Sequence, residues 1–131
     1  MASIKFIKLQ NHYVLDMNIL LILPPNIGRY VVATIPHAGI AYLAAFLERE
    51  GHSVEIADMR IDPSDKNLFA QIERLKPQLI GLSTASIGYK MSYELVSKLK
   101  KSFPHVPIAI GGSHVSTVHT KALEETEADY G

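Results

Sequence analysis

Four short apolar runs recur along the chain, and a stretch with helical periodicity follows each of them. The runs occupy residues 18–23, 52–58, 78–83 and 107–112. Short apolar runs bounded by proline or glycine are typical of buried strands, and strands that alternate with helices indicate a parallel sheet covered on both faces. Because crossovers between parallel strands are right-handed, the alternation predicts an α/β, flavodoxin-like sandwich of three layers, with about five strands in the order 2-1-3-4-5.

The segments between the runs carry the marks of helices. Residues 39–51 place apolar side chains at positions i, i+3, i+4 and i+7 and end in glycine, a common helix terminator. A second helix is predicted to begin near Asp62 and to end before Pro77, and a fourth to cover residues 115–125. Residues 128–131 are predicted to begin a fifth strand. The third helix should bury an apolar stripe of Met91, Leu95, Leu99 and Phe103.

The chain of 131 residues has room for one domain, which we place at residues 18–131. Residues 1–17 are assigned to an N-terminal extension with three open interpretations: an added strand, an arm that joins two copies into a homodimer, or a poorly ordered leader. The longest apolar run, residues 19–23, is far too short to cross a membrane, and the extension lacks the layout of a signal peptide. We therefore expect a cytoplasmic protein without a membrane partner.

Composition excludes several kinds of site. The formal net charge is zero at pH 7, which gives no electrostatic reason to expect a nucleic-acid partner. The chain contains no cysteine, so that it cannot itself hold a disulfide, an iron–sulfur cluster or a cysteine nucleophile. The glycine patterns that cradle nucleotide phosphates, GxGxxG after the first strand and GxxxxGKS/T anywhere, do not occur.

In an open parallel sheet, ligands bind beyond the carboxyl ends of the strands, where the first and third strands meet. Hydroxyl side chains there offer hydrogen bonds, and paired glycines let a ligand approach the backbone closely; the same residues also form ordinary turns. Residues 24–37 form a loop that is long for its position, which favours a functional role over simple cover of the sheet edge. The candidate ligand-binding residues are Pro25, Asn26, His37, Ser83, Thr84, Ala85, Ser86, Gly111, Gly112 and Ser113.

Read together, four stretches resemble a known family: ILLILPPN, PHAGIAYLAAFLEREGHSVEIADM, KPQLIGLSTAS and PIAIGGSHVS. They are similar to the N-terminal cobalamin (B12)-binding domain of B12-dependent radical-SAM enzymes, a group that includes the anaerobic magnesium-protoporphyrin monomethyl ester cyclase and many methyltransferases. The resemblance implies that a corrin ring lies over the carboxyl edge of the sheet, with the nucleotide tail inserted beside the first and third strands. Ser83 and Ala85 would then line the tail pocket, and Gly111 and Gly112 would make room for its dimethylbenzimidazole end.

Two departures from related patterns shape the expected function. Other cobalamin domains carry DxHxxG after the first strand, with a histidine that ligates cobalt, whereas residues 24–28 here read PPNIG. The resemblance therefore implies a histidine-less, base-off site, unless His37 acts as the cobalt ligand instead of being a partly exposed residue near a helix start. Radical-SAM chemistry also needs a CxxxCxxC cluster, so that the iron–sulfur cluster and S-adenosylmethionine would belong to a barrel elsewhere in a longer enzyme.

The expected function is thus a corrinoid-binding module that catalyses nothing alone, within a full-length radical-SAM enzyme of methyltransferase or cyclase type. Two alternatives stay open: a degenerate domain that binds no corrinoid and serves as a packing or dimer surface, or a domain that binds a nucleotide or flavin. Because Gly112 should face the ligand, Gly112→Leu is expected to abolish corrinoid uptake while the domain stays folded.

Overall fold

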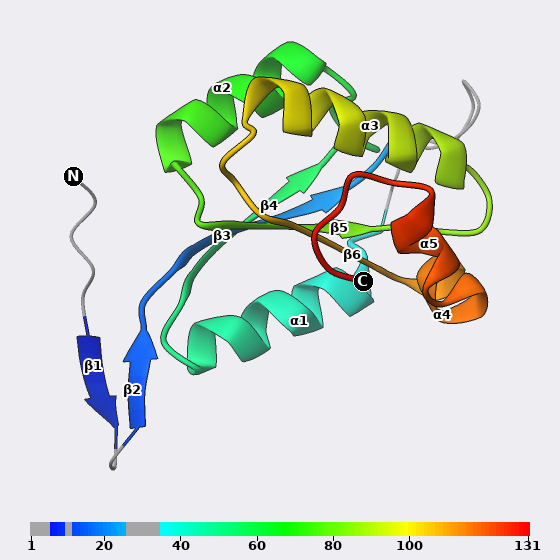
Figure 1. Ribbon diagram of the computed structural model, residues 1–131. Helices are drawn as coiled ribbons and strands as arrows, with labels where there is room; N and C mark the ends of the chain where they lie inside the picture. The colour runs from blue at the N-terminus through cyan, green and yellow to red at the C-terminus, as the bar shows by residue number, and fades with distance from the viewer. Residues whose placement is uncertain (1–5, 10–11, 26–34) are drawn as a thin grey trace.

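A computed structural model describes residues 6–9, 12–25 and 35–131 of the chain. Within these residues the central feature is a parallel sheet of four strands in the order β4-β3-β5-β6 (Figure 1). This is the order 2-1-3-4 of the predicted fold, so that the flavodoxin-like α/β architecture is confirmed. The strands are β3 (Asn18–Leu23), β4 (Ser53–Asp58), β5 (Leu79–Ser83) and β6 (Ile108–Gly111).

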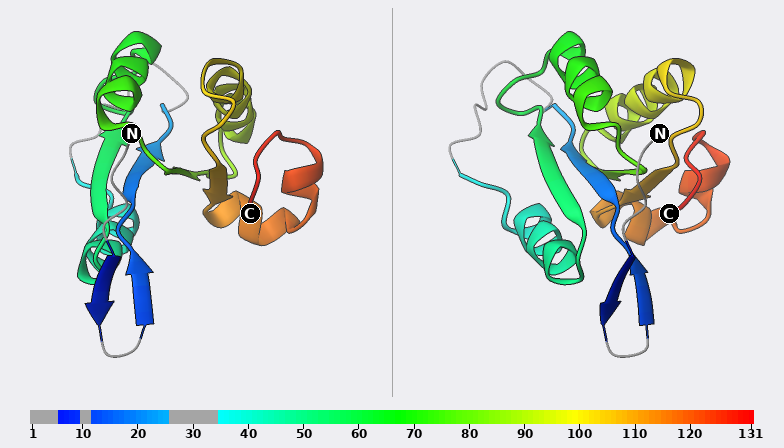
Figure 2. Two further views of the ribbon diagram at one scale, coloured as in Figure 1. Left: turned by 60° about the vertical axis from the view of Figure 1, so that its left-hand side comes forward. Right: turned by 90° about the vertical axis from the view of Figure 1, so that its left-hand side faces the viewer.

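The long helices lie on opposite sides of this sheet. Helix α1 (Ala38–Arg49) covers one face, and α2 (Asp65–Leu75) with α3 (Tyr89–Ser102) covers the other (Figures 1 and 2). The three predicted layers are therefore present. None of the described helices combines the length and the apolarity that crossing a membrane requires.

Local sequence signals explain where these helices begin and end. The His37 side chain caps α1, and Gly51 follows the helix with a φ of 99°, a backbone conformation that glycine adopts readily. Ser64 caps α2 by accepting a hydrogen bond from the Asn67 amide. Lys76 then ends α2 in the left-handed conformation, directly before Pro77.

Three details differ from the sequence predictions. Met91 is 37% exposed, because the buried stripe of α3 runs instead through Ser92, Leu95, Val96 and Leu99. The predicted fourth helix is two short helices, α4 (Ser113–Val118) and α5 (Lys121–Glu124), separated at His119 by a positive φ of 51°. The segment before the break is rich in β-branched and hydroxyl residues, which disfavour a continuous helix.

The predicted fifth strand is reduced to an isolated parallel bridge between Tyr130 and Ala109 of β6. The Ile110 amide donates to the Tyr130 carbonyl at 2.8 Å, and the Asp129 carboxylate accepts from the Ile108 amide at 2.8 Å. This end of the chain is therefore held beside β6, although the described ladder there is too short to count as a strand.

The extension before β3 contains a β-hairpin of β1 (Phe6–Leu9) and β2 (His12–Leu15), which pair with each other as an antiparallel sheet of their own. Figure 2 shows the hairpin extending away from the four-stranded sheet. It adds no strand to that sheet. Its interpretation as a dimer arm stays a prediction.

Candidate functional site

On the α1 side of the sheet, β5 and β6 present much smaller side chains than β3 does. Leu21 of β3 lies opposite Gly81 of β5, and Gly81 lies opposite Ala109 of β6. One step nearer the carboxyl edge, Ser83 lies opposite Gly111. Because these residues are small and α1 packs against β3 and β4, the face of β5 and β6 is hollow on this side.

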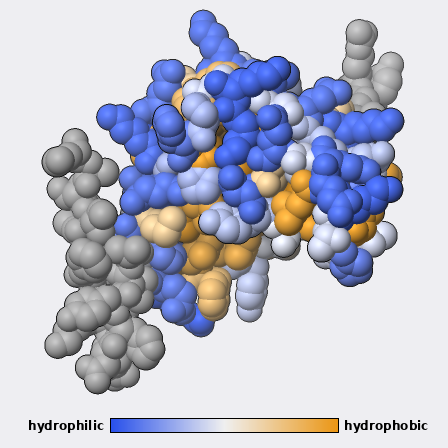
Figure 3. All heavy atoms as spheres, in the orientation of Figure 1, coloured by the Kyte–Doolittle hydropathy of each residue, from blue (hydrophilic) through white to orange (hydrophobic). Residues whose placement is uncertain are grey.

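A cavity of about 400 Å³ occupies this hollow, and we call it the apolar cavity. Its volume lies within the usual range for small-molecule sites. It explains why Leu43 of α1 is 47% exposed although it belongs to the apolar stripe of the helix. Figure 3 shows apolar surface gathered near α1 and the adjoining part of the molecule. The cavity is lined by Leu21, His37, Gly39, Ile40, Leu43, Gly81, Leu82, Ser83, Ala109, Ile110, Gly111 and Gly112.

The two glycines that end β6 differ in what they make possible. A Cβ atom at Gly111 would meet nothing within 4 Å, so that Gly111 leaves open space. A Cβ atom at Gly112 would lie 2.7 Å from the backbone oxygen of Thr84 and 2.9 Å from its nitrogen, and Gly112 has a φ of 99°. Gly112 thus permits a close approach of two backbones, and the expectation that Gly112→Leu leaves the domain folded is wrong.

A second cavity of about 330 Å³ lies beyond the carboxyl ends of β3 and β5, and we call it the edge crevice. At this point the chain leaves β3 for a helix on one face and β5 for a helix on the other, which is where open α/β sheets bind ligands. The crevice is lined by Leu23, Pro24, Pro25, His37, Arg60, Ser83, Ala85, Ile87, Gly88 and Ser92.

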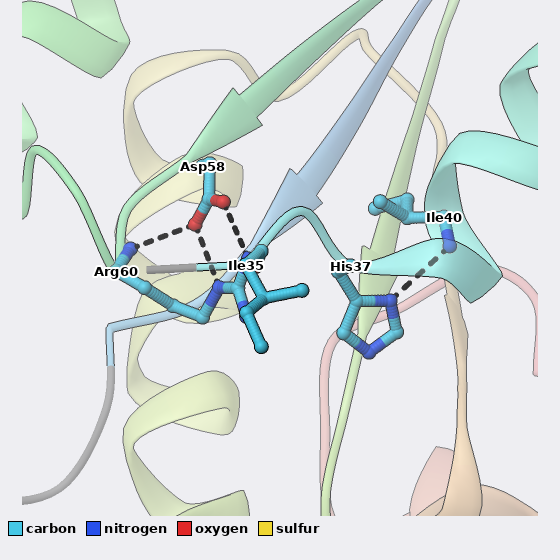
Figure 4. A network of polar contacts seen from close by, with 5 residues as sticks. All are labelled: Ile35, His37, Ile40, Asp58 and Arg60. Carbon is cyan, nitrogen blue, oxygen red and sulfur yellow. Dashed lines mark hydrogen bonds and ion pairs between the residues drawn. The ribbon is translucent and has the colours of Figure 1, made fainter. Parts of the chain in front are cut away.

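His37 lies at the mouth of both cavities, immediately before α1. Its Nδ1 atom accepts a hydrogen bond from the Ile40 amide at 3.2 Å (Figure 4). An imidazole nitrogen that accepts a hydrogen bond carries no proton, so that in the neutral ring the proton lies on Nε2. The N-cap contact therefore fixes Nε2 as a hydrogen-bond donor.

Asp58 and Arg60 form an ion pair where β4 ends (Figure 4). Arg60 donates from Nε to Asp58 Oδ1 at 2.8 Å and from Nη2 to Oδ2 at 2.6 Å, and Nη2 also reaches the Ile35 carbonyl at 3.5 Å. These hydrogen bonds hold the pKa of the Asp58 carboxyl below its ordinary value, with a smaller contribution from nearby His37. The pair ties the turn after β4 to the segment that leads into α1.

An aromatic cluster braces the opposite side of the carboxyl edge. The His114 ring stacks on Tyr89 with centroids 4.3 Å apart, and its Nε2 lies 3.1 Å from the Tyr93 hydroxyl. Burial, with smaller contributions from Glu125 and Tyr89, raises the pKa of Tyr93. The His114 amide donates to the Thr84 carbonyl at 3.1 Å, so that the cluster joins the start of α3 to the ends of β5 and β6.

The sequence-predicted residues are distributed as follows. Gly111 and Gly112 line the apolar cavity, Pro25 and Ala85 line the edge crevice, and His37 and Ser83 line both. Thr84 is fully buried, and its hydroxyl has no partner within the described part of the chain. Ser86 and Ser113 are exposed and line neither cavity. Asn26 lies outside the described residues.

Six residues that line the crevice were absent from the candidate list: Leu23, Pro24, Arg60, Ile87, Gly88 and Ser92. Arg60 follows Asp58 by two residues at a strand end, a spacing that favours a local carboxylate–guanidinium pair. This spacing could have identified Arg60 as a residue of the carboxyl edge. Ser92 gave no such signal, because a serine inside a predicted helix is ordinary. Gly88 precedes α3 and was open to interpretation as a turn residue.

The fold and these two cavities define a ligand-binding domain that can take a flat apolar group on one face of its sheet and a polar group at its carboxyl edge. The family model for the B12 binding domain matches residues 27–131. The chain belongs to this family, whose cofactor is cobalamin.

The comparisons with individual proteins agree with this assignment. The chain is 33% identical, over 83% of its length, to an uncharacterized methyltransferase from Pyrococcus horikoshii, and 24% identical, over 75% of its length, to the anaerobic magnesium-protoporphyrin IX monomethyl ester cyclase of Rubrivivax gelatinosus. It spans 24% and 18% of these two relatives.

A similar fold occurs in the crystal structure of a cobalamin-binding protein from Desulfitobacterium hafniense. The TM-score is 0.62 at 18% sequence identity, and the match covers 86% of this chain and 50% of that one. At this identity the likeness concerns the fold alone.

The described residues fit a cobalamin. The apolar cavity is lined by Gly81, Ala109 and Gly111 in place of larger side chains, and a Cβ atom at Gly111 would meet nothing within 4 Å, as entry of a flat aromatic base requires. Gly111, Gly81 and Ala109 would hold the nucleotide end, and the residues of the edge crevice would face the corrin.

Proposed function

We propose that this chain is the corrinoid-carrying module of a radical-SAM enzyme of methyltransferase or cyclase type, acting in the cytoplasm. The apolar cavity carries the proposal: Ala109 and Gly111 line it in place of larger side chains, and Gly111 faces open space, which leaves room for a nucleotide tail. When bound, a corrinoid supplies a cobalt centre that can carry a methyl group or take part in radical chemistry. The module's own residues bind and orient it for a barrel of the same longer protein.

The proposed site holds the corrinoid base-off and without a histidine ligand. A tail lodged in the apolar cavity is kept away from the cobalt, which is the meaning of base-off. His37 is the candidate residue that could act as a histidine ligand of the cobalt. Its Nδ1 atom already accepts a hydrogen bond from the Ile40 amide. Ligation through Nε2 by the neutral ring would place the proton on Nδ1 and break the hydrogen bond from the Ile40 amide, so that the helix cap argues against it.

We further propose that the module alone catalyses nothing. Reductive cleavage of S-adenosylmethionine needs an iron–sulfur cluster held by cysteines, and this chain has none. The purified chain should therefore release no 5′-deoxyadenosine from S-adenosylmethionine in the presence of a strong reductant. Measurable turnover, assayed by chromatography against a heat-denatured control, would refute this part of the proposal.

Corrinoid retention tests the binding function itself. The purified chain is mixed with hydroxocobalamin, desalted and examined by visible spectroscopy. We expect about one corrinoid per chain with a base-off spectrum. Absence of retained colour would favour a degenerate domain that serves as a packing or dimer surface. Retention of a flavin or nucleotide in place of the corrinoid would favour the alternative of a flavin- or nucleotide-binding domain.

A single substitution tests the absence of histidine ligation. His37→Ser keeps a side-chain acceptor for the Ile40 amide, because serine is a good N-cap residue, but it removes the imidazole. The spectrum of the bound corrinoid should be unchanged in this variant. A shift toward the spectrum of a water-ligated corrinoid, relative to the wild type, would show that His37 binds the cobalt.

A further inference from the structure

Helix α4 is anchored to the rest of the domain by a histidine. The helix has six residues, and α5 after it has four, with the break at His119 between them. Helices of this length are unstable by themselves and depend on packing. Within α4, all of which the structure describes, His114 is the one buried residue, with 8% exposure. The position of α4 therefore depends on what surrounds this side chain.

The start of α3 surrounds the His114 ring with two tyrosines. The ring stacks on Tyr89, with centroids 4.3 Å apart and planes 12° from parallel. It meets Tyr93 edge-on at 5.7 Å, and its Nε2 atom lies 3.1 Å from the Tyr93 hydroxyl. Aromatic pairs of this geometry stabilise beyond the area that they bury. One stack and one hydrogen bond thus fix the ring against α3.

The backbone of His114 fixes the turn that follows β6. Its amide donates to the Thr84 carbonyl at 3.1 Å, and the Thr84 amide donates to the Gly111 carbonyl at 2.7 Å. Between these two hydrogen bonds lies Gly112, where a Cβ atom would be 2.7 Å from the Thr84 oxygen. The side chain and the backbone of His114 therefore fasten the turn after β6 to the segment that leads from β5 into α3.

These two segments border the apolar cavity. Ser83 at the end of β5 lies opposite Gly111 at the end of β6, and both residues line the cavity together with Gly112. The three aromatic residues line neither the apolar cavity nor the edge crevice. They can act on a ligand there only by fixing the residues that contact it. A binding site loses affinity when its supporting residues leave it about 1 Å too loose.

We propose that His114 is a positioning residue for corrinoid binding, which holds Gly111 and Gly112 where the nucleotide tail enters the apolar cavity. The inference rests on the proposed corrinoid function and adds a residue that touches no part of the ligand. Its contribution is preorganisation, because a turn that is already fixed loses less freedom when the tail binds. The effect therefore concerns the tail and leaves recognition of the corrin ring unchanged.

Cobinamide, a corrin that lacks the nucleotide tail, separates these two effects. Isothermal titration measures the affinity of the wild type, His114→Phe and Tyr93→Phe for hydroxocobalamin and for cobinamide. His114→Phe keeps a ring to stack on Tyr89 and removes the hydrogen bond, and Tyr93→Phe removes the same bond from its other end. Each variant should bind hydroxocobalamin about fivefold more weakly, the size of one net hydrogen bond, and cobinamide within about twofold of the wild type.

The double variant tests whether the two residues act through one contact. With both His114→Phe and Tyr93→Phe, no polar group of this pair is left without its partner. Replacement of both partners of a hydrogen bond by apolar groups costs less than removal of one. The double variant should therefore bind hydroxocobalamin no more weakly than either single variant. Effects that multiply would show independent action and would contradict the inference.

Two matched controls remove the same groups elsewhere. Tyr42→Phe and His105→Phe change exposed residues that line neither cavity. Both controls should bind the two corrinoids as the wild type does. Circular dichroism verifies the fold of every variant. Tyr93→Phe removes a single oxygen atom, so that it still tests the inference if His114→Phe fails to fold.

The outcomes separate the inference from the function on which it rests. If the wild type binds neither corrinoid, the proposed function itself fails. If the wild type binds both and the folded His114→Phe and Tyr93→Phe chains match their controls, the corrinoid function stands and His114 serves stability alone. Equal weakening of hydroxocobalamin and cobinamide would locate the effect outside the tail cavity and would equally overturn the inference.

Discussion

The two faces of the central sheet are built from the same strands and yet pack in opposite ways. On the side of α2 and α3, each strand pairs a large aliphatic residue with another: Ile80 lies opposite Leu20 and Ile108, and Leu82 lies opposite Ile22 and Ile110. These residues join one large buried cluster with α2 and α3. On the side of α1, the fully buried cluster is confined to β3 and α1. Leu79 at the start of β5 packs against it, and beyond Leu79 the strands β5 and β6 contribute glycine, alanine and serine.

This difference assigns stability mainly to the face packed against α2 and α3, and binding to the face that lies toward α1. The aliphatic face supplies most of the buried apolar area, and burial of such area is the main favourable term in folding. On the α1 side, β5 and β6 bury less apolar area, and the apolar cavity lies there instead. A strand such as β5 thus serves both purposes, with residues 80 and 82 directed to one face and residues 81 and 83 to the other.

The largest effect should come from truncation on the aliphatic face. Ile80→Ala removes a side chain with 0% exposure, and we expect it to lower the free energy of unfolding by about 3 kcal/mol, from lost transfer energy and the cavity left behind. Leu79→Ala, one residue earlier on the other face, should cost less than half as much. Urea denaturation measures both, and equal costs would remove the proposed difference between the faces.

The glycine pair at the end of β6 should respond unequally to the same small change. Gly112→Ala places a Cβ atom 2.7 Å from the Thr84 backbone at a φ of 99°, and should cost about 1–3 kcal/mol of unfolding free energy. Gly111→Ala adds a methyl group to open space and should change stability by less than about 0.5 kcal/mol. Thermal unfolding of both variants checks this, and a neutral Gly112→Ala would contradict the close backbone approach.

The smallest effect concerns acid stability at the rim of the cavities. Hydrogen bonds from Arg60 lower the folded-state pKa of Asp58 below its unfolded value of about 3.9. The unfolded chain then binds more protons near that pH, so that the contribution of the pair is complete above about pH 5 and declines as the pH falls through the folded pKa. Urea midpoints between pH 5 and pH 2.5 should fall less steeply in Arg60→Gln than in the wild type; parallel curves would contradict the linkage.

Sequence patterns predicted the parts of this molecule that depend on local periodicity. The strands and the order of the sheet follow from apolar spacing. The start of α2 was predicted near Asp62, and the structure caps the helix at Ser64. The hollow face was not predictable in the same way, because LIGLS and IAIG read as apolar strands on both faces. The size difference between Ile80 and Gly81 becomes meaningful only when register places Gly81 beside Ala109.

The binding residues illustrate the same limit. Ser83, Gly111 and Gly112 stand at strand ends, where the position of the carboxyl edge made them candidates. Ser92 became a candidate only through its buried position beside the edge crevice, which is a property of packing. The break at His119 is favoured by the β-branched and hydroxyl residues before it, but its position depends on the positive φ of His119, which the sequence did not indicate.

The central claim is that the hollow face receives the nucleotide tail of a corrinoid. Isothermal titration of hydroxocobalamin and of cobinamide, with the wild type and with Gly111→Leu, tests it most directly, because leucine at residue 111 would fill the apolar cavity while circular dichroism verifies the fold. The wild type should bind hydroxocobalamin more tightly than cobinamide, and Gly111→Leu should weaken hydroxocobalamin by about tenfold or more and leave cobinamide unchanged. Undiminished binding of hydroxocobalamin by folded Gly111→Leu would contradict the account.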